Sequence, residues 1–169
     1  MLPTITWEND VVVMIDQRKL PQKEVYLKLR SVEQVALAIE NMTIRGAPAI
    51  GLAAAYGLAL ATHQVKSEKN LDETFEKAYE RLWRTRPTAR NLFWALERMK
   101  RVFNKNRKQG LEALKDVLLA EAKKMDMEDL AMNMKIGEYG QRLVSDGDTI
   151  LTHCNAGGLA TAGYGTALG

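Results

Sequence analysis

The chain has 169 residues, of which 46% are hydrophobic and 27% charged, and its 24 Lys and Arg exceed its 21 Asp and Glu by a formal charge of +3. This profile is typical of a globular protein that buries a hydrophobic core without disulfides or a structural metal. So small an excess of basic residues does not favour nucleic-acid binding. A single cysteine, Cys154, with only His63 and His153, excludes an internal disulfide and a cysteine-based zinc cage.

The first thirty residues predict a small antiparallel β-meander. Residues 11–15 form a β-branched run, residues 16–19 are a polar turn, and residues 24–30 alternate polar and apolar side chains with a period of two. Residues 1–8 lack a basic leader followed by an apolar run, so we expect no secretory signal and a cytoplasmic protein.

Helical periodicity follows the meander. Capping residues at Ser31 and Asn70, a proline at position 48 and a turn at 86–88 separate the helical patterns. Asp126 is expected to cap the last helix and so to divide two helices. The predicted helices cover 31–42, 48–65, 70–85, 89–105, 111–125 and 127–143.

The uncharged run 46–65 is about long enough to cross a bilayer. It consists mostly of Ala and Gly, however, and Pro48, Thr62 and His63 interrupt it, which is unfavourable for insertion. We therefore expect a helix buried inside protein and no membrane partner.

The sequence pattern changes near residue 145, where the helical periodicity ends. Residues 149–154 predict a strand, 155–158 a glycine turn and 159–168 a helix. We therefore expect an α/β protein with two domains: residues 1–145, a β-meander plus helices, and residues 146–169, the first β-α unit of a Rossmann-like parallel-sheet domain. Because one such unit cannot satisfy its own backbone, we expect a truncated chain whose functional form continues beyond Gly169.

The segment Arg45–Gly51 has the outline of an anion site. Gly46 permits close approach of the backbone, Pro48 suits a first helical turn, and unpaired N–H groups at a helix start lie beside the Arg45 guanidinium. The alternative is a simple tight turn at Gly46, with Arg45 paired to a surface carboxylate.

The segment Arg86–Asn91 places a second guanidinium in a turn before a helix. Arg86 could take two phosphate oxygens at once, whereas Arg90, one turn further along, is expected to face solvent. An ordinary capping or salt-bridge role for Arg86 is the alternative.

The third segment, Thr152–Gly158, contains the cysteine. At the carboxyl end of a strand and before a glycine turn, Cys154 would lie where open α/β sheets bind ligands; the alternative is a small buried hydrophobe. His153 would point to the opposite face and is not its obvious partner. Gly157 and Gly158 are too few for a dinucleotide or ATP fingerprint.

Together, residues 42–51, 86–92 and 152–161 resemble the signature blocks of the methylthioribose-1-phosphate isomerase family. The wider family also contains ribose-1,5-bisphosphate isomerases and regulatory subunits of the exchange factor that serves eukaryotic translation initiation. The block from Arg45 to Gly51, Arg86 and a cysteine after Thr-His are together associated with the isomerase branch, so an enzyme is favoured.

The resemblance implies conversion of 5-methylthioribose 1-phosphate into 5-methylthioribulose 1-phosphate, an aldose-ketose isomerisation in methionine salvage, without a metal or organic cofactor. By this resemblance Arg45, the Gly46–Ala47 backbone and Arg86 bind the phosphate of the small-molecule substrate, and Cys154 is catalytic. The family's acid is an aspartate that would lie past Gly169, and homodimers would form through the second domain. Proton and hydride transfer both remain open. The alternatives are a ribose-1,5-bisphosphate isomerase and a non-catalytic subunit that senses a sugar phosphate or nucleotide.

Overall fold

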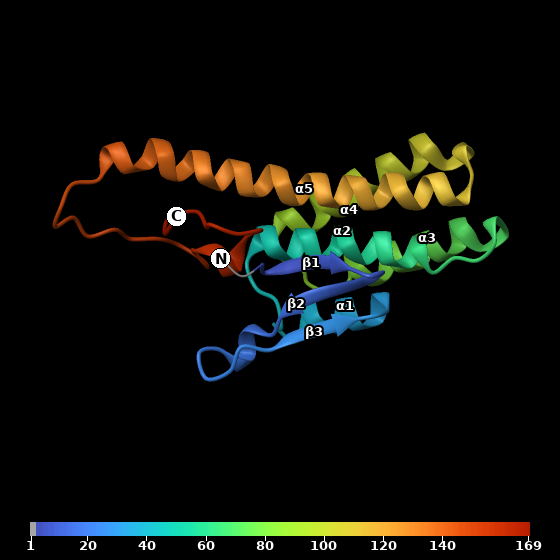
Figure 1. The fold of residues 1–169 in the computed structure, drawn as a ribbon, viewed down its shortest axis with the longest axis horizontal. Helices are drawn as coiled ribbons and strands as arrows, with labels where there is room; N and C mark the ends of the chain where they lie inside the picture. Colours follow the sequence, from blue (N-terminus) through green and yellow to red (C-terminus); the bar gives the residue numbers. More distant parts are fainter. Residues whose placement is uncertain (1–2) are drawn as a thin grey trace.

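An apolar helix, α2 (Ala47–His63), lies at the centre of the fold (Figure 1). The computed structural model describes residues 3–169. Every residue from Ala49 to Thr62 is buried, because α2 contacts the sheet and all the other α-helices. The uncharged run is therefore covered by protein, as predicted. Between residues 3 and 169, no helix has the length and apolar character that a membrane span requires.

The predicted meander is confirmed. Strands β1 (Ile5–Glu8), β2 (Val11–Ile15) and β3 (Tyr26–Leu29) form an antiparallel sheet in the order β1-β2-β3. All five residues of the central strand β2 are buried. Its register pairs Met14 with both Ile5 and Leu27, so one apolar row runs across the sheet.

Three further helices follow the predicted pattern closely: α1 (Val32–Glu40), α3 (Leu71–Trp83) and α4 (Arg90–Asn106). The Ser31 side chain accepts a hydrogen bond from the backbone N–H of Gln34 and caps α1 as expected. Asn70 precedes α3, but its side chain makes no capping bond. Short 3₁₀ turns lie at η1 (Gln17–Lys19), η2 (Glu68–Asn70) and η3 (Arg107–Gln109).

The predicted break at Asp126 is wrong. One continuous helix, α5 (Leu111–Gly140), spans 30 residues and ends in the 3₁₀ turn η4 (Gln141–Leu143). Asp126 instead accepts a hydrogen bond of 2.9 Å from the buried Tyr56 hydroxyl. A side chain satisfied by a neighbouring helix has no need to cap a new one, so the backbone stays helical.

The C-terminal segment also differs from expectation. Residues 149–154 form no strand, and the predicted helix over 159–168 is only a 3₁₀ turn, η5 (Gly158–Ala160), followed by bends. A parallel strand needs a hydrogen-bonded neighbour, and the three strands of residues 3–169 belong to the separate meander. The mixed strand-and-helix architecture is thus shown, while the Rossmann-like domain and the boundary near residue 145 stay predictions.

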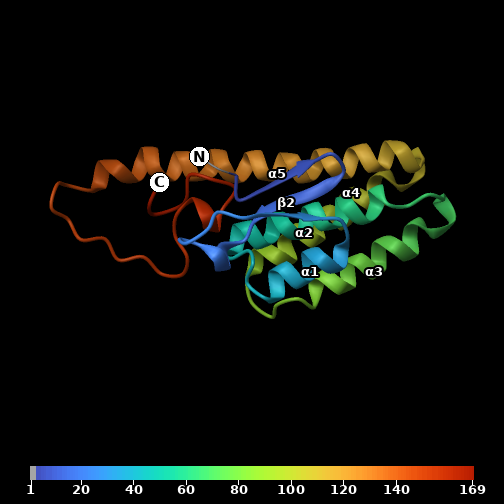
Figure 2. The same cartoon turned by 60° about the horizontal axis from the view of Figure 1, so that its bottom comes forward.

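The C-terminal segment nevertheless returns to the bundle. After α5 the chain loops beyond the end of the helix and comes back to the start of α2, close to Thr4, which directly precedes β1 (Figure 1, Figure 2). Contacts between η5 and α2 confirm this placement. Residues more than a hundred positions apart are thereby brought together.

Candidate functional site

The N-terminus of α2 has no side-chain cap. Gly46 is the N-cap residue with φ of 97°, and Pro48 lies in the first turn. Because glycine has no side chain, no side-chain hydrogen bond caps the first-turn N–H groups. Arg45, directly before the cap, is exposed. Unpaired N–H groups, the positive end of the helix dipole and a guanidinium therefore lie together, which is an arrangement suited to an anion.

The third motif lies against this helix start. Arg45 Nη2 donates a hydrogen bond of 3.4 Å to Asn155 Oδ1. A Cβ placed on Gly46 would lie 2.4 Å from Ala160 Cα, so only glycine permits this approach. The first and third motifs thus form one surface. The partner of Arg45 is an amide and not the surface carboxylate of the alternative prediction.

Cys154 lies one residue from this contact. It is a free, exposed thiol with φ of 65°, in the left-handed region that non-glycine residues seldom adopt. The alternative of a buried cysteine is therefore contradicted for residues 3–169. His153 is also exposed. The strand end that was expected to present Cys154 is absent, and a turn presents it instead.

Two side chains from the first part of the chain hold the segment that follows Cys154. Thr4 Oγ1 donates a hydrogen bond of 2.9 Å to the carbonyl of Gly158, and Gln17 Nε2 donates one of 2.7 Å to the carbonyl of Leu159. These bonds join η5 to the residues that flank β1 and β2. Neither contact was foreseen from the sequence, because both partners are distant in the chain.

A third anchor comes from α5. The backbone N–H of Ala162 donates a hydrogen bond of 2.8 Å to Asp129 Oδ2, and Asn133 Nδ2 donates one of 3.2 Å to the same oxygen. Burial raises the pKa of the Asp129 carboxyl above its ordinary value, although these bonds act in the opposite direction. Asp129 was missed by the sequence reasoning.

The second motif reaches α2 through Asn91 and not through Arg86. A Cβ on Gly51 would lie 2.8 Å from the Asn91 carbonyl oxygen, so α4 and α2 touch at this point. Arg86 is half-buried in the turn before α4 and has no hydrogen bond or ion pair within residues 3–169, which contradicts the salt-bridge alternative. Its guanidinium remains available to an anion, but no described contact joins it to Arg45 or Cys154.

A hollow of about 430 Å³ lies beside these motifs. Pro48 and Gly51 of α2, Arg90 and Asn91 of α4, and Asp129 of α5 contribute to its lining. Arg90 is exposed, as predicted, and still borders this hollow. Residues from the first two motifs and from α5 therefore share one recess.

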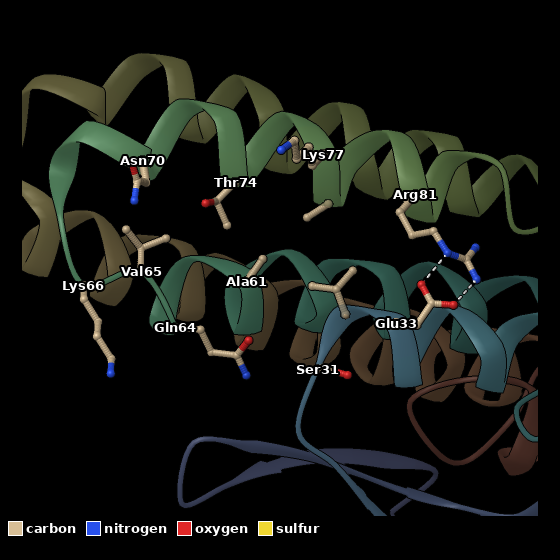
Figure 3. A pocket seen from close by; sticks show the side chains of 12 residues that line it. Ser31, Glu33, Ala61, Gln64, Val65, Lys66, Asn70, Thr74, Lys77 and Arg81 are labelled. Carbon is tan, nitrogen blue, oxygen red and sulfur yellow. Dashed lines mark hydrogen bonds and ion pairs between the residues drawn. The ribbon is translucent and has the colours of Figure 1, made fainter.

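A larger hollow, of about 610 Å³, lies at the opposite end of α2 and is lined by residues such as Ala61, Gln64 and Val65 (Figure 3). The 17 residues of α2 separate the two ends by about 25 Å. In this hollow Arg81 forms an ion pair of 2.7 Å with Glu33, and Lys66 points away from the other cations (Figure 3). None of the three motifs contributes to its lining, so it is not the candidate site.

Comparisons with known proteins place the chain among its relatives. The initiation factor 2 subunit family matches residues 43–163. The chain is 52% identical to a methylthioribose-1-phosphate isomerase of Geobacter sulfurreducens over 98% of the chain and 49% of that protein. It is 48% identical to the protein of the same name from Carboxydothermus hydrogenoformans, over 99% of the chain and 49% of the relative.

Two solved structures share the fold. A 5-methylthioribose 1-phosphate isomerase from Pyrococcus horikoshii superposes with a TM-score of 0.90 at 46% identity, over 98% of this chain and 47% of that one. The translation initiation factor eIF-2B subunit delta from A. fulgidus superposes with a TM-score of 0.87 at 44% identity, over 99% and 49%. The chain therefore spans about half the length of the relatives that it matches.

Proposed function

The chain belongs to the initiation factor 2 subunit family, and we propose that it is part of an isomerase that converts 5-methylthioribose 1-phosphate into 5-methylthioribulose 1-phosphate. One observation carries the proposal: the Arg45 guanidinium at the uncapped start of α2 contacts Asn155, the residue that follows the exposed Cys154. The guanidinium thus contacts the residue next to the thiol, and the names of the relatives supply the substrate.

In this proposal the phosphate is held at the start of α2. Arg45 and the backbone N–H groups of Gly46 and Ala47 bind its oxygens, and Arg86 adds a second guanidinium. Holding the phosphate fixes the distance between the sugar carbons and Cys154. Binding would also replace the long bond of 3.4 Å between Arg45 and Asn155.

The reaction moves one hydrogen from C2 to C1 of the sugar. Because the phosphate occupies the anomeric oxygen, an acid must protonate the ring oxygen before the ring opens. In the proton route, the acid gives its proton to the ring oxygen as the bond from that oxygen to C1 breaks, and a base removes the C2 proton to leave an enol phosphate. C1 then takes up the proton, while the C2 hydroxyl returns its own proton to the acid and becomes the ketone; Cys154 is the proposed acid/base. A hydride route, in which Cys154 adjusts the polarity of the site, has the same overall balance. We propose that the acid is an aspartate in a part of the enzyme that follows residue 169.

We further propose that residues 146–169 begin a Rossmann-like domain that later residues complete. Apolar side chains of this region are exposed, including Ile150, Leu151 and Leu168. The last turns of α5 also expose Ile136 and Tyr139. Surfaces of this kind are normally covered by further protein. Homodimerisation through that domain and a cytoplasmic location are parts of the same proposal.

A regulatory subunit is the second candidate, because one of the two structural neighbours is a translation initiation factor subunit. Such a subunit would bind a sugar phosphate or nucleotide at the same anion site and would not isomerise it. A ribose-1,5-bisphosphate isomerase would need a second cationic pocket for the second phosphate. The three candidates differ in which of the two sugar phosphates, if either, is converted, and one experiment separates them.

The test uses the full-length protein with each of the two sugar phosphates, with formation of the ketose followed by NMR. We expect turnover of the methylthio sugar and a fall of at least about a hundredfold in kcat for Cys154→Ser, because general acid–base groups contribute on this scale. Binding of inorganic phosphate should be retained, and His153→Ala, which changes the exposed neighbour, should keep nearly wild-type turnover. Absence of ketose from both sugars, with phosphate still bound, would favour the regulatory subunit.

A further inference from the structure

We propose that Asp129 is a positioning residue, whose carboxylate fixes the glycine-rich segment 157–165 against the start of α2 and thereby sets the place of Cys154 and Asn155 relative to Arg45. This inference rests on the proposed function for its catalytic consequence. The contacts that carry it are independent of the substrate.

Asp129 occupies the buried face of α5. The residues that α5 buries before it recur at helical spacing and are apolar: Leu114, Leu118, Ala122 and Met125. Asp129 and Asn133 continue the same row one and two turns later. A carboxylate on such a face loses part of its hydration, which is the cause of its raised pKa. Its position is therefore explained by a specific partner and not by packing.

That partner is the backbone of the returning segment. Oδ2 of Asp129 accepts the Ala162 N–H at 2.8 Å. Asn133 is 2% exposed, and its Oδ1 has no hydrogen-bond partner among residues 3–169, whereas its Nδ2 donates both to Asp129 Oδ2 and to the Asp129 carbonyl. Burying an unsatisfied oxygen is costly, so the amide of Asn133 is oriented by its bonds to Asp129.

The segment is thus held from two sides. On the sheet side, Thr4 and Gln17 donate to the carbonyls of Gly158 and Leu159. On the helix side, Asp129 accepts from Ala162. Ala160, which touches Gly46, lies between these anchors. A displacement of either anchor would therefore move the contact with the helix that holds Arg45.

Further contacts within the segment connect the anchor at Ala162 to Gly157. Thr161 is buried, and its hydroxyl donates to the Gly163 carbonyl at 2.8 Å. A Cβ on Gly165 would lie 2.3 Å from Gly157 Cα, so the two ends of the segment touch. Gly157 follows Cys154 by three residues, and fixing it therefore limits where the thiol can lie.

The test compares Asp129→Ala and Asp129→Asn in the full-length protein, with Asp116→Ala as the matched control. Asp116 is an exposed aspartate of the same helix without a described partner. We expect amide exchange of residues 157–165 to become about tenfold faster or more in Asp129→Ala, because a hydrogen bond to a charged group is lost. Asp129→Asn keeps a neutral acceptor and should lie between. Exchange in α3 should not change in any variant.

Activity supplies the second measurement. We expect kcat for the methylthio sugar to fall about tenfold or more in Asp129→Ala, with a smaller change in KM, since phosphate binding by Arg45 persists while the thiol is misplaced. The rate of Cys154 alkylation, and its protection by inorganic phosphate, should change in the same variant and not in Asp116→Ala.

The outcomes separate the two proposals. Unchanged exchange in 157–165, or kcat equal to that of Asp116→Ala while the wild type is active, would overturn the role of Asp129. An inactive wild type whose segment still opens in Asp129→Ala would refute the isomerase and leave the restraint standing. If Asp129→Ala does not fold, Asp129→Asn and Thr4→Val decide the matter, because Thr4→Val removes the opposite anchor and should produce the same local opening.

Discussion

The helical bundle and the C-terminal segment are held by different forces. In the bundle, apolar side chains are buried together, as in the Phe75 and Phe103 rings, whose centroids are 3.9 Å apart. Residues 144–169 depend largely on single polar contacts, such as those of Thr4 and Asp129. Apolar burial stabilises the whole domain, whereas one hydrogen bond fixes one place. The candidate thiol therefore belongs to a part of the molecule whose place is set by a few individual hydrogen bonds.

The largest expected effect tests the bundle. Phe75→Ala removes a ring that is 1% exposed and stacked on Phe103. We expect the free energy of unfolding to fall by about 3–5 kcal/mol, the usual cost of a large-to-small change in a core. Urea unfolding measures it. Leu168→Ala, at a position 75% exposed in the C-terminal segment, should change stability by less than about 0.5 kcal/mol. Similar losses of stability in Phe75→Ala and Leu168→Ala would contradict the view that apolar burial stabilises the bundle more than the C-terminal segment.

A smaller and more local effect is expected at Gly46. Gly46→Ala requires φ of 97° for a residue with a side chain and places its Cβ 2.4 Å from Ala160 Cα. We expect a loss of about 1–3 kcal/mol from backbone strain, relieved by release of segment 157–165 from α2. Amide exchange should become faster in that segment while α3 keeps its protection. The control is Gly140→Ala, because Gly140 ends α5 with no atom within 4 Å of a Cβ and should be neutral or slightly stabilising. Uniformly faster exchange would show that Gly46 supports the whole fold instead.

The bundle and the C-terminal segment also differ in how well they could be predicted from the sequence. Local signals were sufficient in the bundle: Ser31 caps α1, Pro48 lies in the first turn of α2, and the β-branched run of β2 indicates a strand of the meander. The predicted helix break at Asp126 was wrong because the sequence does not reveal that the Tyr56 hydroxyl, from another helix, donates a hydrogen bond to this carboxylate. Residues 149–154 have the composition of a strand, but a strand depends on a neighbour that local composition does not supply.

The candidate site was predicted in part. Glycine and arginine chemistry at residues 45–46 identified the start of α2, and the structure places Asn155 and Ala160 against it. The role of Asp129 was not predicted because its hydrogen-bond partner, Ala162, is distant in the sequence. One signal was available: counting back from Asp129 in steps of four and three reaches Met125 and Ala122, so a carboxylate interrupts an apolar row. The convergence of Arg86 with Arg45 remains a prediction.

The smallest effect concerns the hydrogen bond between Tyr56 of α2 and Asp126 in the middle of α5. Burial raises the pKa of Asp126, despite the hydrogen bond from Tyr56, so the folded protein holds this proton more tightly than the unfolded chain. As pH rises from about 4, the unfolded chain loses the proton first, and the free energy of unfolding falls until the folded group has also ionised.

Asp126→Asn cannot ionise, and its amide oxygen can still accept a hydrogen bond from Tyr56. Its stability relative to the wild type should therefore increase between pH 4 and pH 7. Urea unfolding across this pH range measures the difference, with the exposed Asp116→Asn as control. A difference that shrinks as pH rises would mean that the ionised carboxylate stabilises the fold, and that α5 is held to Tyr56 by its charge.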